Sequence, residues 1–246
     1  MKRLCITCIG ILVCSMASAT AELPVKVLMP GGVFHGDEIK HEGGDGWWGL
    51  VREGDGFALR ETRVTLTRAN DPIVDNEGEK TGKNIVCDLE GEVLYLFKGG
   101  VAFKAGAVQT INATTQFLFP GEHVELRFKH PDSGRDQQWT YYAAGVATGA
   151  KGIGLIEGYT LAITDQPEGS QASHQALYSV KELDTRYGEG GASLLWVGDL
   201  DRDGKPDLLM NLSDHYNVMN VTLFLSSLAK NRAMLEKAGE LITTGC

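Results

Sequence analysis

Short runs of alternating or β-branched apolar residues, separated by Gly, Asp and Asn turns, fill most of the chain after residue 23. Such runs are typical of strands in antiparallel sheets. The expected strands span residues 24–29, 48–51, 57–68, 84–89, 92–97, 123–128, 138–146, 159–164, 176–183, 193–198, 207–212 and 220–226. The pattern therefore predicts an all-β protein, mainly of antiparallel sheets and sandwich- or barrel-like.

Two segments depart from this simple alternation. The run LAKNRAMLEKAGEL, near residues 228–241, contains mostly strong helix formers, so we expect at most one short C-terminal helix, which this run or part of it would form. In the long run at 57–68, Phe57 and Leu59 share one face, whereas Val64 and Leu66 fall on the other. A strand keeps one face only while its period of two is unbroken, so we expect a bulge or bend near residues 60–62.

The N-terminus has the pattern of an export signal. Lys2 and Arg3 precede a largely apolar run up to residue 16, and Ala17-Ser18-Ala19 offers a small-x-small cleavage site. The apolar run is shorter than the roughly 20 residues that cross a bilayer as a helix, and no second such run follows. We therefore expect a signal peptide over residues 1–19 and an exported mature protein without a membrane span, either periplasmic or secreted.

The mature chain is expected to hold a β-rich domain over residues 20–187 and a second segment over residues 188–246, packed as part of the same domain. The Gly-rich stretch GEGGAS at 188 marks the division. The whole chain has 32 acidic and 23 basic residues and a net charge of −9. Nucleic acids and anionic membrane surfaces bind basic patches on proteins, so the negative net charge argues against both as partners.

Two of the five cysteines, Cys87 and Cys246, lie outside the leader. In an exported protein with two cysteines, a disulfide between them is the simplest expectation, and it would tie the C-terminal tail to the body. The alternative is a pair of free or catalytic thiols, but the chain has no Cys-x-x-Cys spacing to support redox chemistry.

The stretch GDLDRDGKPDLLM, residues 198–210, places four aspartates within nine positions. Carboxylates this close repel one another by about 1 kcal/mol per pair even in water, so a cation is expected among them. The predicted ligands are Asp199, Asp201, Asp203, the carbonyl of Lys205 and Asp207, with Gly204 permitting the reversal of the loop. Hard oxygen ligands in this number suit calcium better than magnesium or a soft metal. The alternative is a solvated turn without a bound ion.

The residues around the aspartates decide which calcium loop this stretch resembles. An EF-hand or a dockerin would have an acidic ligand at the twelfth loop position, where Met210 stands, and helices on both sides. Here SLLWV precedes the loop and LLMNL follows it, and both are strand sequences. The stretch resembles the D-x-D-x-D-G-x-x-D loop of FG-GAP or VCBS repeats. This resemblance implies a hairpin stiffened by calcium, but the single copy does not imply the β-propeller that several copies build.

Other polar and aromatic groups give weaker signals. The loop at 33–50 is rich in His, Asp and Glu without a recognised metal spacing, and Ser213-Asp214-His215 are adjacent without a nucleophile turn, so both are interpreted as loops. A sugar-binding platform could be built from several aromatic residues, although filling of the core is the preferred interpretation. These residues are Trp47, Trp48, Trp139, Tyr141 and Tyr142.

Two classes of function remain. The favoured one is an exported, calcium-binding, non-catalytic protein that binds or interacts with an unknown protein or glycan, since no catalytic signature is found. The alternative is a periplasmic or secreted hydrolase whose catalytic groups the sequence does not reveal and in which calcium is structural.

Overall fold

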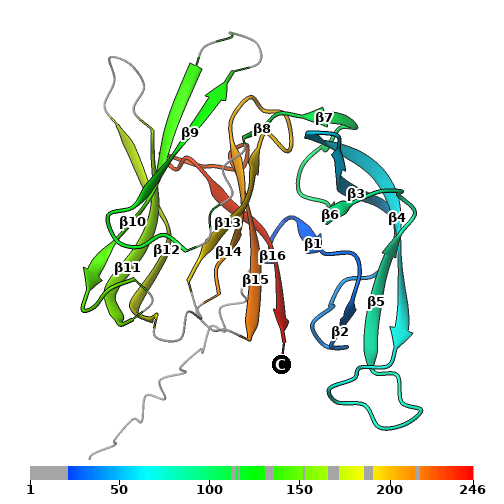
Figure 1. The fold of residues 1–246 in the computed structure, drawn as a ribbon. Coiled ribbons are helices and arrows are strands. Elements are labelled where there is room, and N and C mark those ends of the chain that lie inside the picture. The colour runs from blue at the N-terminus through cyan, green and yellow to red at the C-terminus, as the bar shows by residue number, and fades with distance from the viewer. Residues whose placement is uncertain are drawn as a thin grey trace, which may run out of the picture.

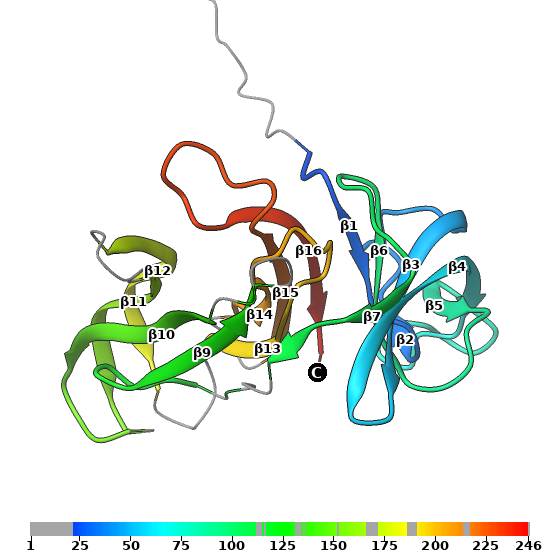
Figure 2. The same ribbon diagram turned by 90° about the horizontal axis from the view of Figure 1, so that it is seen from above.

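The computed structural model describes residues 22–111, 115, 117–130, 134, 136–151, 153–165, 172–185, 191–213 and 217–245. These residues form three antiparallel sheets that stack as layers, with the five-stranded sheet in the middle (Figures 1 and 2). The seven-stranded sheet covers one side of it and the four-stranded sheet covers the other. The all-β fold expected from the strand pattern is confirmed.

The seven-stranded sheet curls around its own buried face in Figure 2. Its strands are β1 (Lys26–Leu28), β2 (Val33–Phe34), β3 (Gly44–Glu53), β4 (Gly56–Ala69), β5 (Gly82–Cys87), β6 (Val93–Lys98) and β7 (Gly106–Val108). The four-stranded sheet contains β9 (His123–Lys129), β10 (Asp136–Ala147), β11 (Leu155–Asp165) and β12 (Ser173–Asp184). The middle sheet contains β8 (Thr110–Ile111), β13 (Ser193–Gly198), β14 (Asp207–Asn211), β15 (Val218–Leu225) and β16 (Glu236–Thr244).

The middle sheet is buried on both faces, and this explains the continuous apolar runs of its strands. Side chains alternate between the faces of a strand. In β14, Leu208 and Met210 pack in the core shared with the four-stranded sheet, whereas Leu209 packs in the core shared with the seven-stranded sheet. Phe224 and Leu223 divide in the same way in β15. Strands covered on both faces are expected to lack polar positions.

All twelve expected strands are present, with their ends shifted by a few residues. Three short strands, β2, β7 and β8, were not expected. Each has only two or three residues. Such a length is too short to show an alternation of polar and apolar side chains.

The C-terminal segment that could have held one short helix contains none, and its second half forms β16. This strand pairs with β15 from Val218↔Thr244 to Leu225↔Glu236. A shift of register opposite Leu223 and Phe224 leaves Ala238 unpaired with β15, and its carbonyl accepts a hydrogen bond from Val25 N at 2.8 Å. Pairing with β15 along most of the strand outweighs a helix preference that amounts to a few tenths of a kcal/mol per residue.

The phase change expected in the long strand lies where it was predicted. In β4, Leu59 and Thr62 are buried, whereas Arg60 and Glu61 between them are both exposed. The pairing with β3 stays regular at these two residues, and the shift of register lies further along, between Gly44 and Trp47 of β3. The strand therefore changes face by bending, and the bulge belongs to its neighbour.

Several expectations concern residues outside the described part of the chain. The predicted leader, residues 1–19, lies there, as does Cys246. Cys87 is half-buried and forms no disulfide with another described residue, and its pairing with Cys246 stays a prediction. Among the described residues, none belongs to an apolar helix of membrane-spanning length.

Candidate metal centre

The aspartate stretch forms the turn of the β13–β14 hairpin, as the flanking strand sequences predict. The two strands pair from Ser193↔Asn211 to Gly198↔Asp207, so residues 199–206 make the connection. The backbone N–H of Asp199 donates to Gln109 O at 2.8 Å, which fixes the start of the loop against the segment before β8. The hairpin belongs to the middle sheet, and its loop therefore lies between the two outer layers.

Three of the carboxylates converge in the interior. Asp199, Asp201 and Asp207 are 4%, 9% and 0% exposed, and one oxygen of each lies within 4.8 Å of the others. Oδ1 of Asp199 and Oδ1 of Asp201 are buried and accept no hydrogen bond from any described residue. Within the described ranges, no ion pair compensates these three carboxylates. Buried carboxylates without a counter-charge are rare unless they are protonated or hold a cation.

Asp207 is the most enclosed of the three and is held by donors on both oxygens. Its Oδ2 accepts from Leu200 N at 2.7 Å, within the loop. Its Oδ1 accepts from the backbone N–H of Ser226 at 2.8 Å and from the Ser226 hydroxyl at 3.1 Å. The end of β15 therefore fixes the carboxylate that closes the predicted ligand set.

Asp203 and Lys205, the other two predicted ligands, lie at the exposed side of the loop. Asp203 accepts from Lys205 N at 2.9 Å and from the Ser226 hydroxyl at 3.0 Å. The shared hydroxyl places Asp203 beside Asp207, although Asp203 is outside the group of three converging carboxylates. The structure thus brings together three of the four predicted aspartates and places the fourth next to them.

The environment of the loop favours the protonated form of its buried carboxyls when no cation is bound. Burial raises the pKa of Asp199 to about 6, and the charges of Asp203 and Asp201 add to the increase. Burial likewise raises the pKa of Asp201, although the Ser227 hydroxyl, which donates to its Oδ2, opposes the change. The pKa of Asp207 is raised most clearly, again chiefly by burial.

Two residues of the loop connect it to the outer layers. Arg202 has a left-handed backbone, with φ 62°, and its Nη2 donates to the carbonyls of Ala105 and Ala107 beside β7, each at 3.0 Å. On the other side, a Cβ added at Gly204, which has φ 88°, would lie 3.1 Å from Nε2 of His130, the residue after β9. The loop is therefore the point where all three sheets meet.

Sequence reasoning missed the two serines that close the site. Ser226 and Ser227 lie 19 to 26 residues after their aspartate partners. Their hydroxyls are hard oxygen donors and acceptors, a type that also suits calcium. The available signal was the pair of hydroxyls at the end of the predicted strand at 220–226, and it acquires meaning only when β15 is placed beside β14.

The weaker candidates lie elsewhere. Trp47, Trp139 and Tyr141 are buried in the two cores, so the preferred interpretation of these aromatic residues is confirmed for these three. His35 forms a close hydrogen bond with the buried Asp71, away from the aspartate loop. Of the Ser213-Asp214-His215 sequence, only Ser213 lies within the described residues. In this part of the chain, the group of three aspartates is the one that meets the geometry of a metal site.

Comparisons with known proteins identify no relative of this chain. A scan against protein-family models found no match, and searches of curated proteins and of solved structures found none either. The candidate site is therefore argued from its own chemistry.

Proposed function

We propose that the chain is an exported protein in which calcium bound by the β13–β14 loop stabilises a non-catalytic binding or interaction module. The main support for a calcium site is a pair of buried oxygens, Asp199 Oδ1 and Asp201 Oδ1, which have no hydrogen-bond partner among the described residues. A cation placed between them and Asp207 would satisfy both oxygens and remove the repulsion among three carboxylates. At a separation of about 4 Å, that repulsion is about 4 kcal/mol per pair near a protein surface.

Calcium is the cation that we propose because the available ligands are all oxygens. Three carboxylates converge, the carboxylate of Asp203 and the carbonyl of Lys205 lie on the same loop, and calcium accepts six to eight such ligands in flexible geometry. Magnesium prefers strict octahedral geometry and retains several waters. The export signal proposed for residues 1–19 would deliver the protein to a compartment where calcium is more abundant than in the cytosol.

The role that we propose for the ion is structural. The loop donates through Arg202 to carbonyls beside β7 and packs at Gly204 against His130, so an ordered loop fixes both outer layers to the middle sheet. Each tenfold excess of calcium over its dissociation constant would add about 1.4 kcal/mol to stability. The ion would then stiffen the module. We prefer the binding class over the hydrolase because the sequence holds no catalytic signature.

The test compares the wild type with Asp199→Asn after removal of divalent ions with a chelator. We expect millimolar calcium to raise the melting temperature of the wild type and to release heat in a titration. Asp199→Asn should lose both effects while melting at or above the metal-free wild type, because asparagine can still accept from Gly204 N and removes a buried charge. Asp55→Asn, in an exposed turn, is the matched control and should respond to calcium like the wild type. No calcium uptake by the wild type at millimolar concentrations would refute the proposal.

A further inference from the structure

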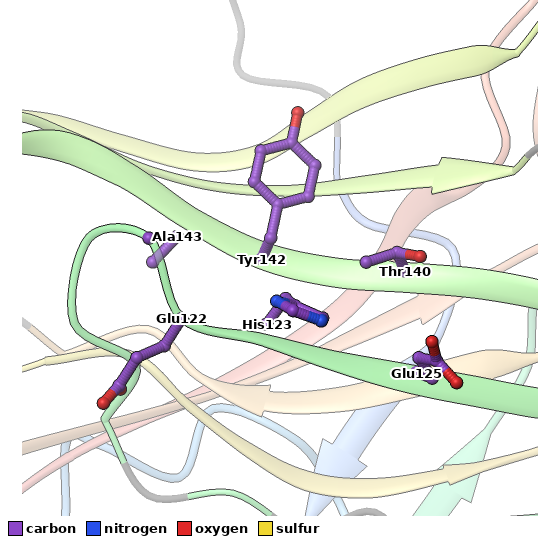
Figure 3. Close-up of a pocket in the computed structure, with 7 residues that line it drawn as sticks. Glu122, His123, Glu125, Thr140, Tyr142 and Ala143 are labelled. Carbon is purple, nitrogen blue, oxygen red and sulfur yellow. The ribbon is translucent and has the colours of Figure 1, made fainter.

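The outer face of the four-stranded sheet carries a groove of about 350 Å³ near the start of β9. Its polar lining comes from Glu122, His123 and Glu125 on one side and from Thr140 and Tyr142 on the other. His123 pairs across the strands with Tyr142, and Glu125 pairs with Thr140. Figure 3 shows Glu122 and Glu125 at opposite ends of the groove, with His123 and Tyr142 between them. The volume is at the lower end of the range for small-molecule sites.

Tyr142 is held in one position before any ligand arrives. Its hydroxyl lies 2.7 Å from Nδ1 of His174 on β12, and the two rings are 5.9 Å apart between centroids. Ala162 on β11, which is paired with Tyr142, adds only a methyl group to this face. A half-buried aromatic ring with a fixed orientation can stack on an apolar surface at little cost in side-chain entropy.

The two glutamates of the groove already have cationic partners. Both oxygens of Glu122 accept from Lys151 Nζ, at 2.9 and 2.7 Å, and Glu125 accepts from Arg127 Nη2 at 2.7 Å. A cationic ligand would have to displace these partners, and an anionic ligand would face two carboxylates. The groove therefore suits a neutral ligand that presents several hydroxyls, because paired acid and base side chains can both donate to it and accept from it.

We propose that this groove binds one or two rings of a neutral saccharide, with an apolar ring face stacked on Tyr142 and hydroxyl groups bonded by Glu125 and Thr140. This inference rests on the proposed function, because it names the ligand class of the binding module. The groove is separate from the calcium loop. His123 lies seven residues before His130 along β9, which is roughly 23 Å in an extended strand.

The test titrates the mature, calcium-loaded protein with three neutral probes, namely cellotriose, maltotriose and tri-N-acetylchitotriose, followed by calorimetry. We expect at least one of them to bind. Tyr142→Ala should weaken that binding at least tenfold, whereas Tyr142→Phe should retain most of it because the stacking ring remains. Ser179→Ala, on the outer face at β12, is the matched control and should bind like the wild type.

Three outcomes would overturn the inference: no binding of any probe at millimolar concentration, equal binding by Tyr142→Ala, or binding of trilysine in preference to the saccharides. The melting temperature of each variant shows whether it is folded. Calcium uptake, measured on the same samples, keeps the two proposals distinguishable. Saccharide binding without calcium uptake would refute only the proposed calcium site. Calcium uptake without saccharide binding would refute only the proposed saccharide groove.

Discussion

Ser226 donates to Asp207 through both its backbone N–H and its hydroxyl, so one residue at the end of β15 provides two bonds to the same buried oxygen. The hydroxyl also lies 3.0 Å from both oxygens of Asp203. The hairpin loop is thus held by the neighbouring strand as well as by its own turn. A cation would meet carboxylates that are already positioned.

Replacement of Ser226 by alanine removes the hydroxyl and leaves the N–H bond in place. We expect Ser226→Ala to lower the stability of the metal-free protein by about 1 kcal/mol, the usual net value of one such hydrogen bond. Urea denaturation in the presence of a chelator measures the change. Ser173→Ala is the exposed control, because Ser173 accepts a side-chain hydrogen bond through its backbone carbonyl, which the variant keeps, and it should leave the midpoint unchanged. An unchanged midpoint for Ser226→Ala would show that the hydroxyl contributes nothing to the loop.

The strands could be predicted from the sequence because their local signal is strong, but their layering could not. Leu208, Leu209 and Met210 form a continuous apolar run, which indicates a strand covered on both faces. Which residues belong to which core depends on sheets formed by distant parts of the chain, which contribute Leu50 to one core and Leu126 to the other. No local pattern contains that information.

The aspartates of the loop could be predicted because a turn brings its own ligands together. The serines and the contacts of Arg202 could not. The partner of Arg202 is a backbone carbonyl at Ala105, 97 residues earlier, and any residue has a carbonyl. The register of β14 with β15 decides that Ser226, and no other hydroxyl, reaches Asp207. Contacts that depend on register across a sheet leave no trace in spacing along the chain.

A substitution at Gly239 distinguishes a helix in the C-terminal segment from the strand β16 that the structure contains. In a helix, Gly239→Ala would stabilise the protein by about 1 kcal/mol. In β16, the added Cβ would lie 2.3 Å from the carbonyl oxygen of Val25, so we expect a loss of about 1–3 kcal/mol from overpacking. Gly245→Ala, where a Cβ meets nothing within 4 Å, is the matched control. Urea denaturation of the two variants decides the sign, and stabilisation by Gly239→Ala would contradict the strand.

The half-buried His35 and the buried Asp71 form a pair whose contribution to stability depends on pH. The hydrogen bond between them raises the pKa of His35 and lowers the pKa of Asp71. The contribution of His35 is complete below about pH 6.5 and is lost as the pH rises through its raised pKa, whereas that of Asp71 is complete above about pH 3.9 and is lost on acidification. The advantage of the wild type over His35→Asn should therefore be largest between about pH 4 and pH 6.5.

Urea denaturation of both proteins from acid to alkaline pH measures this advantage. The charges of Glu38 and Asp37 also raise the pKa of His35. Both residues remain in the variant, so their other effects on stability largely cancel in the comparison. An advantage that stays constant from pH 5 to pH 8 would show that the charged pair adds no stability beyond a neutral hydrogen bond.

If the aspartate loop binds calcium as proposed, removal of the ion should reverse the pH dependence of stability. In the metal-free protein the pKa of Asp199 is about 6, compared with about 3.9 in an unfolded chain, so the folded state binds the proton more tightly. The metal-free wild type should therefore lose stability relative to Asp199→Asn as the pH rises from about 4 through about 6, by about 3 kcal/mol at most. With saturating calcium the ligands are deprotonated, protons compete with the ion, and the wild type should lose stability as the pH falls. Denaturation of both proteins across this range, with calcium and with a chelator, measures the two slopes, and slopes of the same sign would contradict a cation held by Asp199.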